Sequence, residues 1–310
     1  MRQSGVMTGG KNNKGMALVI TLLVVALLSA VVVEFAYGVY ISTNALHNWQ
    51  TAQRLSLAAK SATRLGARLI MENASLNLSY TYPGQMEVAQ KIPFDEIDGA
   101  TVLRIEDEKS KLNLNSLVPK NGIIDTRTSG PYASFLRMLK ALNLKADIAD
   151  RIVDWIDTDS EPRLRDSENS AKNGYLDSID ELLLIPGIDR ESYERLVPYV
   201  TIYGSVPGSP AQININGAAI PVLMSLSDDI SADMAERIVR YREASPFAAT
   251  GEISRVSGFD KLNMPLTYMT VKGTVFRVLA TAQTGNIKRI IESVIDIYGG
   301  SRIVMYWKEY

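Results

Sequence analysis

The run from Met16 to Val33, MALVITLLVVALLSAVVV, carries no charge and limits what the chain can fold into more than any other feature. At a rise of about 1.5 Å per residue, it is long enough to cross a bilayer core of about 30 Å as a helix. The segment before it holds Arg2, Lys11 and Lys14 and no acidic residue. Positive charge predicts that the short end stays in the cytoplasm. We therefore expect a single-pass protein, with its main part exported across the inner membrane if the source is bacterial.

The residues after this run keep a helical pattern. From Ala45 onward apolar residues recur at helical spacing, and neither proline nor glycine occurs before Gly66. We expect one transmembrane and spine helix over 16–72, on the order of 80 Å long. The only histidine, His47, is then an ordinary residue on the helix surface.

The junction Lys14-Gly15-Met16 resembles the type IV prepilin signal, which is the hallmark of pilins and of type II secretion pseudopilins. The resemblance implies a leader over 1–15 that prepilin peptidase removes after Gly15, with methylation of the new terminus at Met16. An ordinary uncleaved anchor is the alternative. Most pilins have glutamate at the fifth mature position, where this chain has Ile20. Because Ile20 cannot neutralise the amine of a neighbouring subunit, the substitution suits the end of a fibre.

Composition excludes many kinds of chemistry. The chain has no cysteine and one histidine, which removes disulfides, thiolate metal sites, cysteine nucleophiles and the usual triad and zinc hydrolases. Lysine plus arginine (33) nearly balances aspartate plus glutamate (34), so net charge gives no pull toward nucleic acid. Carboxylate clusters, which suit hard cations such as Ca²⁺, are what remains.

The predicted fold class is α+β, with a long N-terminal helix packed on an antiparallel sheet, as in type IV pilins, and a large, mostly helical insertion. We expect the first part of an α/β pilin head over 73–115, including a hairpin of Thr101–Ile105 with Lys111–Asn115. An inserted helical domain is expected over 116–263. The C-terminal antiparallel sheet is expected over 264–310, with strands at Tyr268–Val271, Val275–Ala282, Lys288–Tyr298 and Arg302–Trp307.

The order of these features resembles minor pseudopilin K of type II secretion systems. The matching strings are Lys111-Leu112-Asn113-Leu114-Asn115, Arg151-Ile152-Val153-Asp154-Trp155-Ile156-Asp157-Thr158-Asp159, Ile179-Asp180-Glu181-Leu182, Val197-Pro198-Tyr199-Val200-Thr201 and Ile213-Asn214-Ile215-Asn216. The resemblance implies a tip subunit of the periplasmic pseudopilus in a type II protein secretion system. Such a subunit assembles in the inner membrane with minor pseudopilins I and J and with other pseudopilins, and initiates or caps the fibre.

An acidic cluster lies between Asp147 and Glu181, a segment that contains eleven acidic residues and four basic ones. The candidate metal ligands are Asp157, Asp159, Glu161, Asp166, Glu168 and Asp177. Crowded carboxylates repel one another, and a divalent cation relieves that repulsion. A solvated loop paired with Arg163 and Arg165 is the alternative. The resemblance adds Ca²⁺ as the expected cofactor, although the family usually has Gly-Ala where this chain has Asp166-Ser167.

Two segments, Leu182–Asp189 and Ile253–Phe259, look like helix-hairpin-helix elements. They keep open a membrane-anchored DNA receptor of the competence type as an alternative function. Asp189 and Asp260, however, stand where DNA-binding hairpins have a second glycine, and their charges would repel phosphate. We therefore expect no nucleic-acid partner. A carboxylate-pair hydrolase using Asp154 and Asp157 is a third possibility, and we expect no enzymatic activity.

Overall fold

The structure, a computed structural model, divides into two compact units, Met1–Arg54 and Leu55–Tyr310. The residues that it describes are 13–76, 79–92, 98–122, 124, 130–159, 161–165, 167, 171–297 and 302–310. The expected leader therefore lies outside the described residues, except for its last three positions.

Helix α1 runs without interruption over Asn13–Ser75, so the prediction of one long helix from Met16 is confirmed. In the first unit its described side chains are mostly exposed, and the apolar run through Ile20 is exposed throughout. It is the one helix among the described residues that is long and apolar enough to cross a membrane. Apolar side chains in such number are stable only in lipid or against other apolar surfaces.

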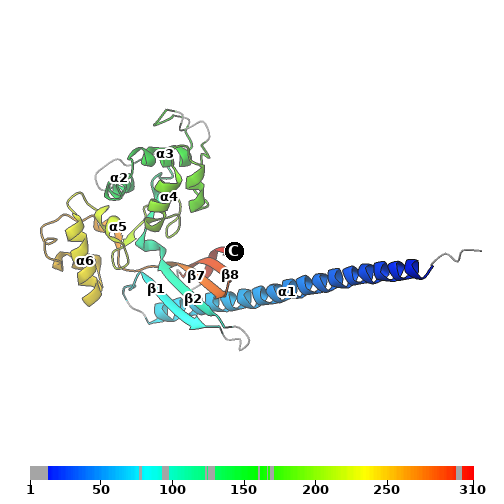
Figure 1. Cartoon of the computed structure of the whole chain (residues 1–310). Coiled ribbons are helices and arrows are strands. Elements are labelled where there is room, and N and C mark those ends of the chain that lie inside the picture. Colours follow the sequence, from blue (N-terminus) through cyan, green and yellow to red (C-terminus); the bar gives the residue numbers. More distant parts are fainter. Residues whose placement is uncertain are drawn as a thin grey trace, which may run out of the picture. The chain divides into compact units, whose positions relative to one another are not determined.

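The second unit contains a five-stranded antiparallel sheet in the order β1-β2-β7-β8-β9 (Figure 1). Its strands are β1 (Gln85–Lys91), β2 (Ala100–Asp107), β7 (Val275–Thr284), β8 (Ile287–Asp296) and β9 (Ile303–Glu309). Neighbouring strands that are far apart in sequence, such as β2 and β7, bring the two ends of the head together.

The part of α1 within this unit packs on one face of the sheet. Leu55 and Ala59 are fully buried and share a core with Val278 and Ile291 of the central strands. Gly66 lets the helix approach closely, because a Cβ added there would lie 2.9 Å from Val278 Cγ1. A long helix covering an antiparallel sheet confirms the predicted pilin-like fold class.

Two local predictions are wrong. Lys111–Asn115 does not form a hairpin with Thr101–Ile105; β3 (Leu112–Asn113) pairs in parallel with β4 (Val200–Thr201) instead. Likewise, Tyr268–Val271 does not join the terminal sheet, because β6 (Met269–Thr270) pairs in parallel with β5 (Ile213–Asn214). In both places a two-residue segment pairs inside the helical part of the molecule, and of the residues paired there only Thr270 is not fully buried.

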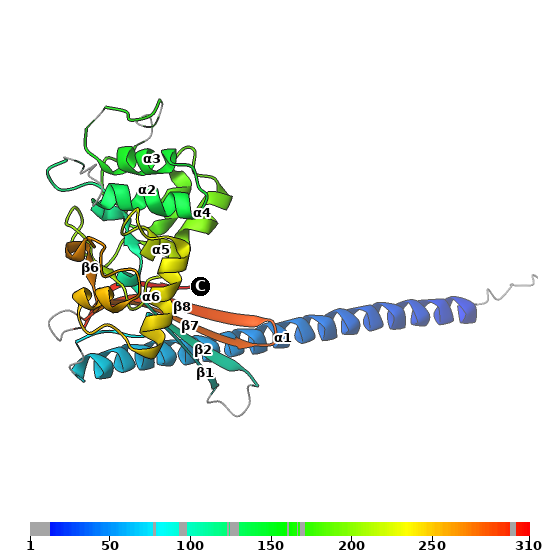
Figure 2. The same cartoon turned by 90° about the vertical axis from the view of Figure 1, so that its left-hand side faces the viewer.

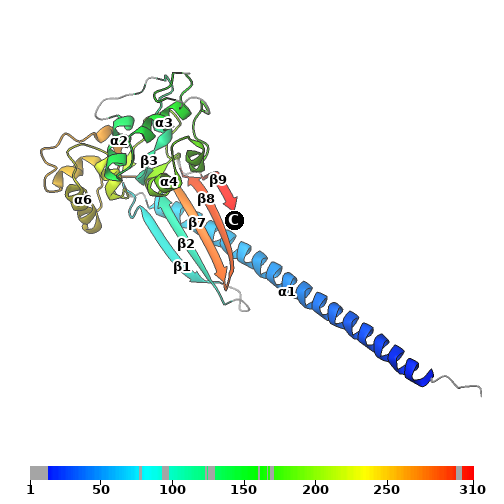
Figure 3. The same cartoon turned by 45° about the horizontal axis from the view of Figure 1, so that its top comes forward.

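The helical part lies between β2 and β7 in sequence and beyond one end of their strands (Figures 2 and 3). Its α-helices are α2 (Pro131–Ala141), α3 (Asp147–Ile156), α4 (Arg190–Leu196), α5 (Ile220–Met224) and α6 (Ala232–Ala244). Its 3₁₀ turns, together with those flanking it, are η1 (Glu108–Ser110), η2 (Leu114–Ser116), η4 (Ile179–Leu184), η5 (Val197–Tyr199), η6 (Thr250–Arg255) and η7 (Leu266–Tyr268). One continuous hydrophobic core, separate from that of the sheet, holds them together.

These helices form two copies of one module. The pattern A-D-x-A-x-R-I-V opens α3 at Ala146 and recurs in α6 from Ala232. Each copy begins with an N-x-N strand, places a 3₁₀ turn after the patterned helix, and ends in the strand that pairs in parallel with its first one. We refer to the stretch from β3 to β4 as the first module and that from β5 to β6 as the second.

A buried asparagine closes each module in the same way. The side chain of Asn115 donates to Leu176 O (2.9 Å) and accepts from Leu176 N (2.9 Å). Asn216 makes the same pair of bonds with Phe247 O and N, both at 2.9 Å. Because buried peptide groups must be hydrogen-bonded, each asparagine fixes the chain that enters the following 3₁₀ turn.

Candidate functional site

The acidic loop belongs to the first module alone. There, residues 157–175 separate α3 from Leu176, whereas only Ser245 and Pro246 separate α6 from the equivalent Phe247. Among the helix positions at which the copies differ, α3 has an acidic residue, Asp154, where α6 has a basic one, Arg240. The loop is therefore an addition to one copy. A structural role that both modules share does not explain why only the first has it.

Asp154 organises the start of this loop from inside the core. Its side chain is fully buried, and its Oδ2 accepts a hydrogen bond from Arg163 N (2.9 Å) and another from the hydroxyl of Ser167. Its Oδ1 is buried without a hydrogen-bond partner among the described residues and lies 3.9 Å from Arg163 Nε. From the sequence, Asp154 was a candidate half of a catalytic pair; in the structure it holds the loop.

The predicted metal ligands are distributed as follows. Asp157 is buried at the end of α3, and Asp159 lies in the exposed turn, where its Oδ1 accepts from Glu161 N (2.9 Å). Asp177 bonds to Lys172 Nζ at 2.6 Å. Asp166 and Glu168 lie outside the described residues.

Within the described part of the chain, no group of three or more aspartate, glutamate or histidine side chains is arranged to hold a metal ion. Asp159 is used in a turn, and Asp177 is neutralised by a lysine. The described carboxylates are therefore not grouped as a calcium site, and two of the six predicted ligands, Asp166 and Glu168, lie outside the described residues.

The first of the two hairpin-like segments, Leu182–Asp189, is used for packing. Gly187 has a positive φ of 89°, and a Cβ there would lie 2.5 Å from the guanidinium carbon of Arg151. The same guanidinium group donates a hydrogen bond from Nη1 to Pro186 O (2.7 Å). Asp189 caps α4 by accepting from Ser192 N (2.7 Å), a bond that lowers the pKa of Asp189. The turn that would meet a phosphate in a DNA-binding hairpin is thus filled by an arginine of the same module.

A buried ionic cluster, which the sequence analysis missed, lies where the sheet meets the first module. Glu108 is fully buried and accepts from Lys111 Nζ (2.8 Å) and Arg277 Nε (2.9 Å). The hydroxyl of Thr201, at the end of the first module, also bonds to this carboxylate. Burial alone would raise the pKa of Glu108, but Lys111 and Arg277 lower it to about 2.

The adjacent Asp107 joins the sheet to the second module. Its Oδ2 accepts from Asn214 Nδ2 (2.7 Å), and its Oδ1 accepts from Lys109 N (2.9 Å). Burial raises the pKa of Asp107 to about 6, although both hydrogen bonds oppose the shift. Gly273 is required beside it, because a Cβ there would lie 2.2 Å from Asp107 Oδ2.

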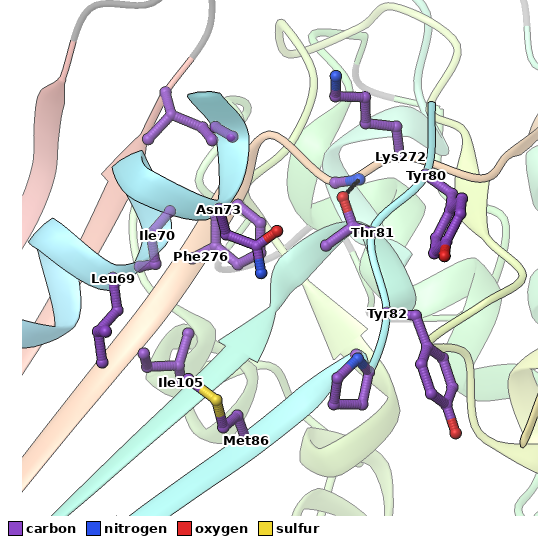
Figure 4. A pocket seen from close by; sticks show the side chains of 15 residues that line it. Leu69, Ile70, Asn73, Tyr80, Thr81, Tyr82, Met86, Ile105, Lys272 and Phe276 are labelled. Atoms are coloured by element: carbon purple, nitrogen blue, oxygen red, sulfur yellow. Dashed lines mark hydrogen bonds between the residues drawn. The ribbon is translucent and has the colours of Figure 1, made fainter. Parts of the chain in front are cut away.

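A small cavity opens next to this junction (Figure 4). The last turns of α1, including Ile70 and Asn73, form one wall, and Phe276 of β7 forms another. The segment after α1 closes it, where Thr81 Oγ1 accepts from Gly273 N (3.1 Å). The end of the long helix, the sheet and the segment that follows the second module, at Lys272 and Gly273, therefore meet around one apolar space.

Comparison with protein families matches both modules. Two family models, each described as type II secretion system protein K, match residues 110–205 and 213–272, which together make up half of the chain. The chain belongs to the type II secretion protein K family. The boundary between the two matched regions coincides with the boundary between the two modules.

Relatives of this protein K cover nearly the whole chain. The protein K of Pseudomonas aeruginosa is 26% identical over 310 residues, covering 92% of this chain and 89% of the relative. That of Aeromonas hydrophila is also 26% identical, with 94% and 95% covered. A chain of the GspK–GspI–GspJ complex from enterotoxigenic Escherichia coli has the same fold, with a TM-score of 0.63 at 20% identity over 86% of this chain and 99% of that one.

Family and fold together make this protein K a minor pseudopilin of a type II secretion system, as the sequence predicted. Its α1 fits a single-pass membrane anchor. The DNA-receptor alternative is not favoured, because it accounts for neither the family nor the helix-on-sheet head.

Proposed function

We propose that this protein K is the tip subunit of the periplasmic pseudopilus, where it initiates or caps assembly with minor pseudopilins I and J. The observation that carries the proposal is the position of the two modules beyond one end of the sheet, fastened there by Glu108 and Asp107. A subunit in the middle of a fibre needs that end free for its neighbour. The modules block it, so further subunits add from below. The structural relative was solved in a complex with GspI and GspJ, which supports these partners.

The exposed apolar part of α1 is proposed to span the inner membrane, with the head in the periplasm. The basic residues before it favour this orientation. Ile20, 57% exposed, adds no charge in the bilayer, where an unpaired carboxylate would cost about 2.5–3.5 kcal/mol. A subunit that neutralises no amine above it is consistent with the last position of the fibre.

Prepilin peptidase is proposed to cleave after Gly15 and to methylate Met16. Mass spectrometry of the membrane-extracted protein should show a methylated chain that begins at Met16. Gly15→Leu should retain the leader, whereas Gly38→Leu, a change at another open glycine of α1, should not. A retained leader in the unaltered protein would remove the prepilin assignment.

The acidic loop of the first module is proposed to bind Ca²⁺ through Asp157, Asp159, Glu161, Asp166, Glu168 and Asp177. The support is the local excess of negative charge and the buried oxygen of Asp154 at the loop's base. Calcium should then raise the melting temperature, and Asp157→Ala with Asp159→Ala should abolish the rise while Asp260→Ala preserves it. A melting temperature that calcium does not change would refute the site.

The tip position is tested by locating labelled copies on isolated pseudopili and by co-purification from membranes. We expect label at one end and subunits I and J in the purified material. Label along the whole fibre, or DNA in place of the pseudopilins, would contradict the proposal. The protein is proposed to act through assembly alone and to catalyse no reaction.

A further inference from the structure

Exposed apolar side chains of the head concentrate on its last strand. Among the described residues from Leu55 onward, fourteen large apolar side chains are exposed, and five of them lie within the eight residues 303–310. These five, which we name the β9 strip, are Ile303, Val304, Met305, Trp307 and Tyr310, each 47–59% exposed.

The strip is large enough to be a binding surface. With about half of each side chain in solvent and about 150–250 Å² for a large side chain, it exposes on the order of 400 Å². Apolar patches of this size on a monomer are commonly functional. At about 3.3 Å per residue the strip is about 25 Å long, which suits an elongated partner.

The other edge of the sheet differs. Strand β1 is exposed along its whole length, but its large apolar exposed residues are Met86 and Val88, each at 37%. Charged and polar residues occupy most of the rest of β1. An open edge alone therefore does not explain the β9 strip.

The end of β9 lies beside α1, and because side chains alternate along a strand, Val304 and Trp307 of the strip stand on the side of the sheet that α1 covers. Glu309, at the end of β9, accepts hydrogen bonds from Ser56 Oγ (2.5 Å) and bonds to Lys60 Nζ (3.1 Å), both on α1. Trp307 pairs with Ser293, and Glu309 pairs with Ile291, so both side chains are on the face of the sheet that α1 covers. Trp307 therefore stands in the angle between the sheet edge and the helix.

The edge is built for side-chain packing and against strand addition. The register between β8 and β9 is irregular at Val294/Ile295, and such a bulge distorts the free edge. Lys308 and Glu309 put charges at its end. Both features discourage pairing with a further strand, while the apolar side chains remain available.

We propose that the β9 strip, centred on Trp307, is the surface on which the long helix of a neighbouring pseudopilin packs, parallel to α1. This rests on the proposed assembly with pseudopilins I and J and names the contact surface. A sheet edge about 25 Å long that carries exposed apolar side chains and contacts α1 at Glu309 suits a second helix in length and chemistry. Tryptophan at its centre is the residue type that most often dominates such contacts.

The absence of cysteine makes the test direct, because one introduced thiol is unique. The full chain is prepared in membranes as Trp307→Cys and as the control Val88→Cys on β1, each with and without co-expressed subunits I and J. Maleimide labelling of Trp307→Cys should slow at least about fivefold when the partners are present, since interface cores exclude solvent. Labelling of Val88→Cys should be unchanged.

Trp307→Asp should reduce recovery of the partners about thirtyfold, and Val88→Asp should leave it unchanged. Equal labelling of the two thiols in membranes where the partners do co-purify would overturn the β9 surface while leaving the tip assignment intact. Protection of Trp307→Cys without the partners would mean that a second copy or the membrane covers the strip, which also overturns it. Failure of the unaltered chain to recover any pseudopilin would instead refute the assembly on which the inference rests.

Discussion

Replacing Glu108 with glutamine should destabilise the head by about 3 kcal/mol at neutral pH. The folded protein lowers the pKa of this carboxyl from 4.5 to about 2, which corresponds to about 1.4 kcal/mol per unit. The same change leaves Arg277 and Lys111 buried without their central anion. Removing one partner of a buried ion pair typically costs about 3–5 kcal/mol, which agrees in size.

The pH dependence follows from the sign of this shift. The stabilisation by Glu108 is fully present above about pH 4.5, the ordinary value, and is lost as the pH falls toward about 2. Wild type and Glu108→Gln should therefore differ at pH 7 and converge near pH 2. Urea unfolding of the full chain in detergent, followed by tryptophan fluorescence, measures the free energy of unfolding of both proteins at each pH.

Glu106→Gln is the matched control, because Glu106 bonds to the same Lys111 (2.9 Å) but is more exposed. Because the Glu106 side chain is partly exposed to solvent whereas that of Glu108 is fully buried, the loss of the Glu106 charge should cost less than the loss of the Glu108 charge. If Glu108→Gln and Glu106→Gln unfold at the same urea concentration at pH 7, the buried cluster does not fasten the modules, and the reasoning fails.

Three further changes test the junction and the cores. Gly66→Leu should destabilise the head by at least about 1–3 kcal/mol through overlap with Val278, whereas Gly38→Leu should not; urea unfolding of both variants decides. The pKa of Asp107 is raised from 3.8 to about 6, so wild type should lose stability as the pH rises from about 4 to about 6. Asp107→Asn should remove this loss, which melting temperatures measured across the same pH range would show. Asn216→Ala should cost about 1–3 kcal/mol by leaving the buried amide and carbonyl that it satisfies unpaired, and an unchanged melting temperature would count against its role as a module closure.

The helix and the terminal strands were predictable because their signals are local. An uncharged run continued by helical periodicity indicates a long helix, and β7 and β8 are rich in β-branched residues, with a turn at Gly285 between them. Strand β1 was missed because its sequence, QMEVAQK, is exposed on both faces and shows no clear alternation. An edge strand is held by backbone hydrogen bonds to its one neighbour, so its side chains need not follow a pattern that identifies it as a strand.

The wrong hairpin shows where the pattern misleads. Leu112-Asn113-Leu114-Asn115 alternates like a half-buried strand, but all four residues are buried. The asparagines are inside because their amides serve the backbone, as Asn115 does for Leu176. Alternation of apolar and polar residues therefore reports one exposed face only when the polar residues have no internal partner.

The acidic loop was predictable from its charge, but the contacts that hold it were not. Charge crowding identified the acidic loop, whereas the role of Asp154 depends on Arg163 and Ser167, which only folding brings to it. Glu108 gave no sequence signal, because two of its partners, Thr201 and Arg277, are distant in the chain. The duplication did leave a signal, the repeated A-D-x-A-x-R-I-V, which the unequal lengths of the two copies obscured.

The two modules are attached to the sheet by different contacts. At equivalent strand positions, Asn214 of the second module donates to Asp107 of the sheet (2.7 Å), whereas Asn113 of the first donates to Tyr203 O (2.7 Å), just beyond β4, and the first module reaches the sheet through Thr201 and Glu108 instead. The first module instead carries Asp154 and the acidic loop, for which the second has Arg240 and a short connection. Both copies are therefore fastened to the sheet and closed by a buried asparagine, and the first copy alone adds a charged loop, which neither the fastening nor the closure requires.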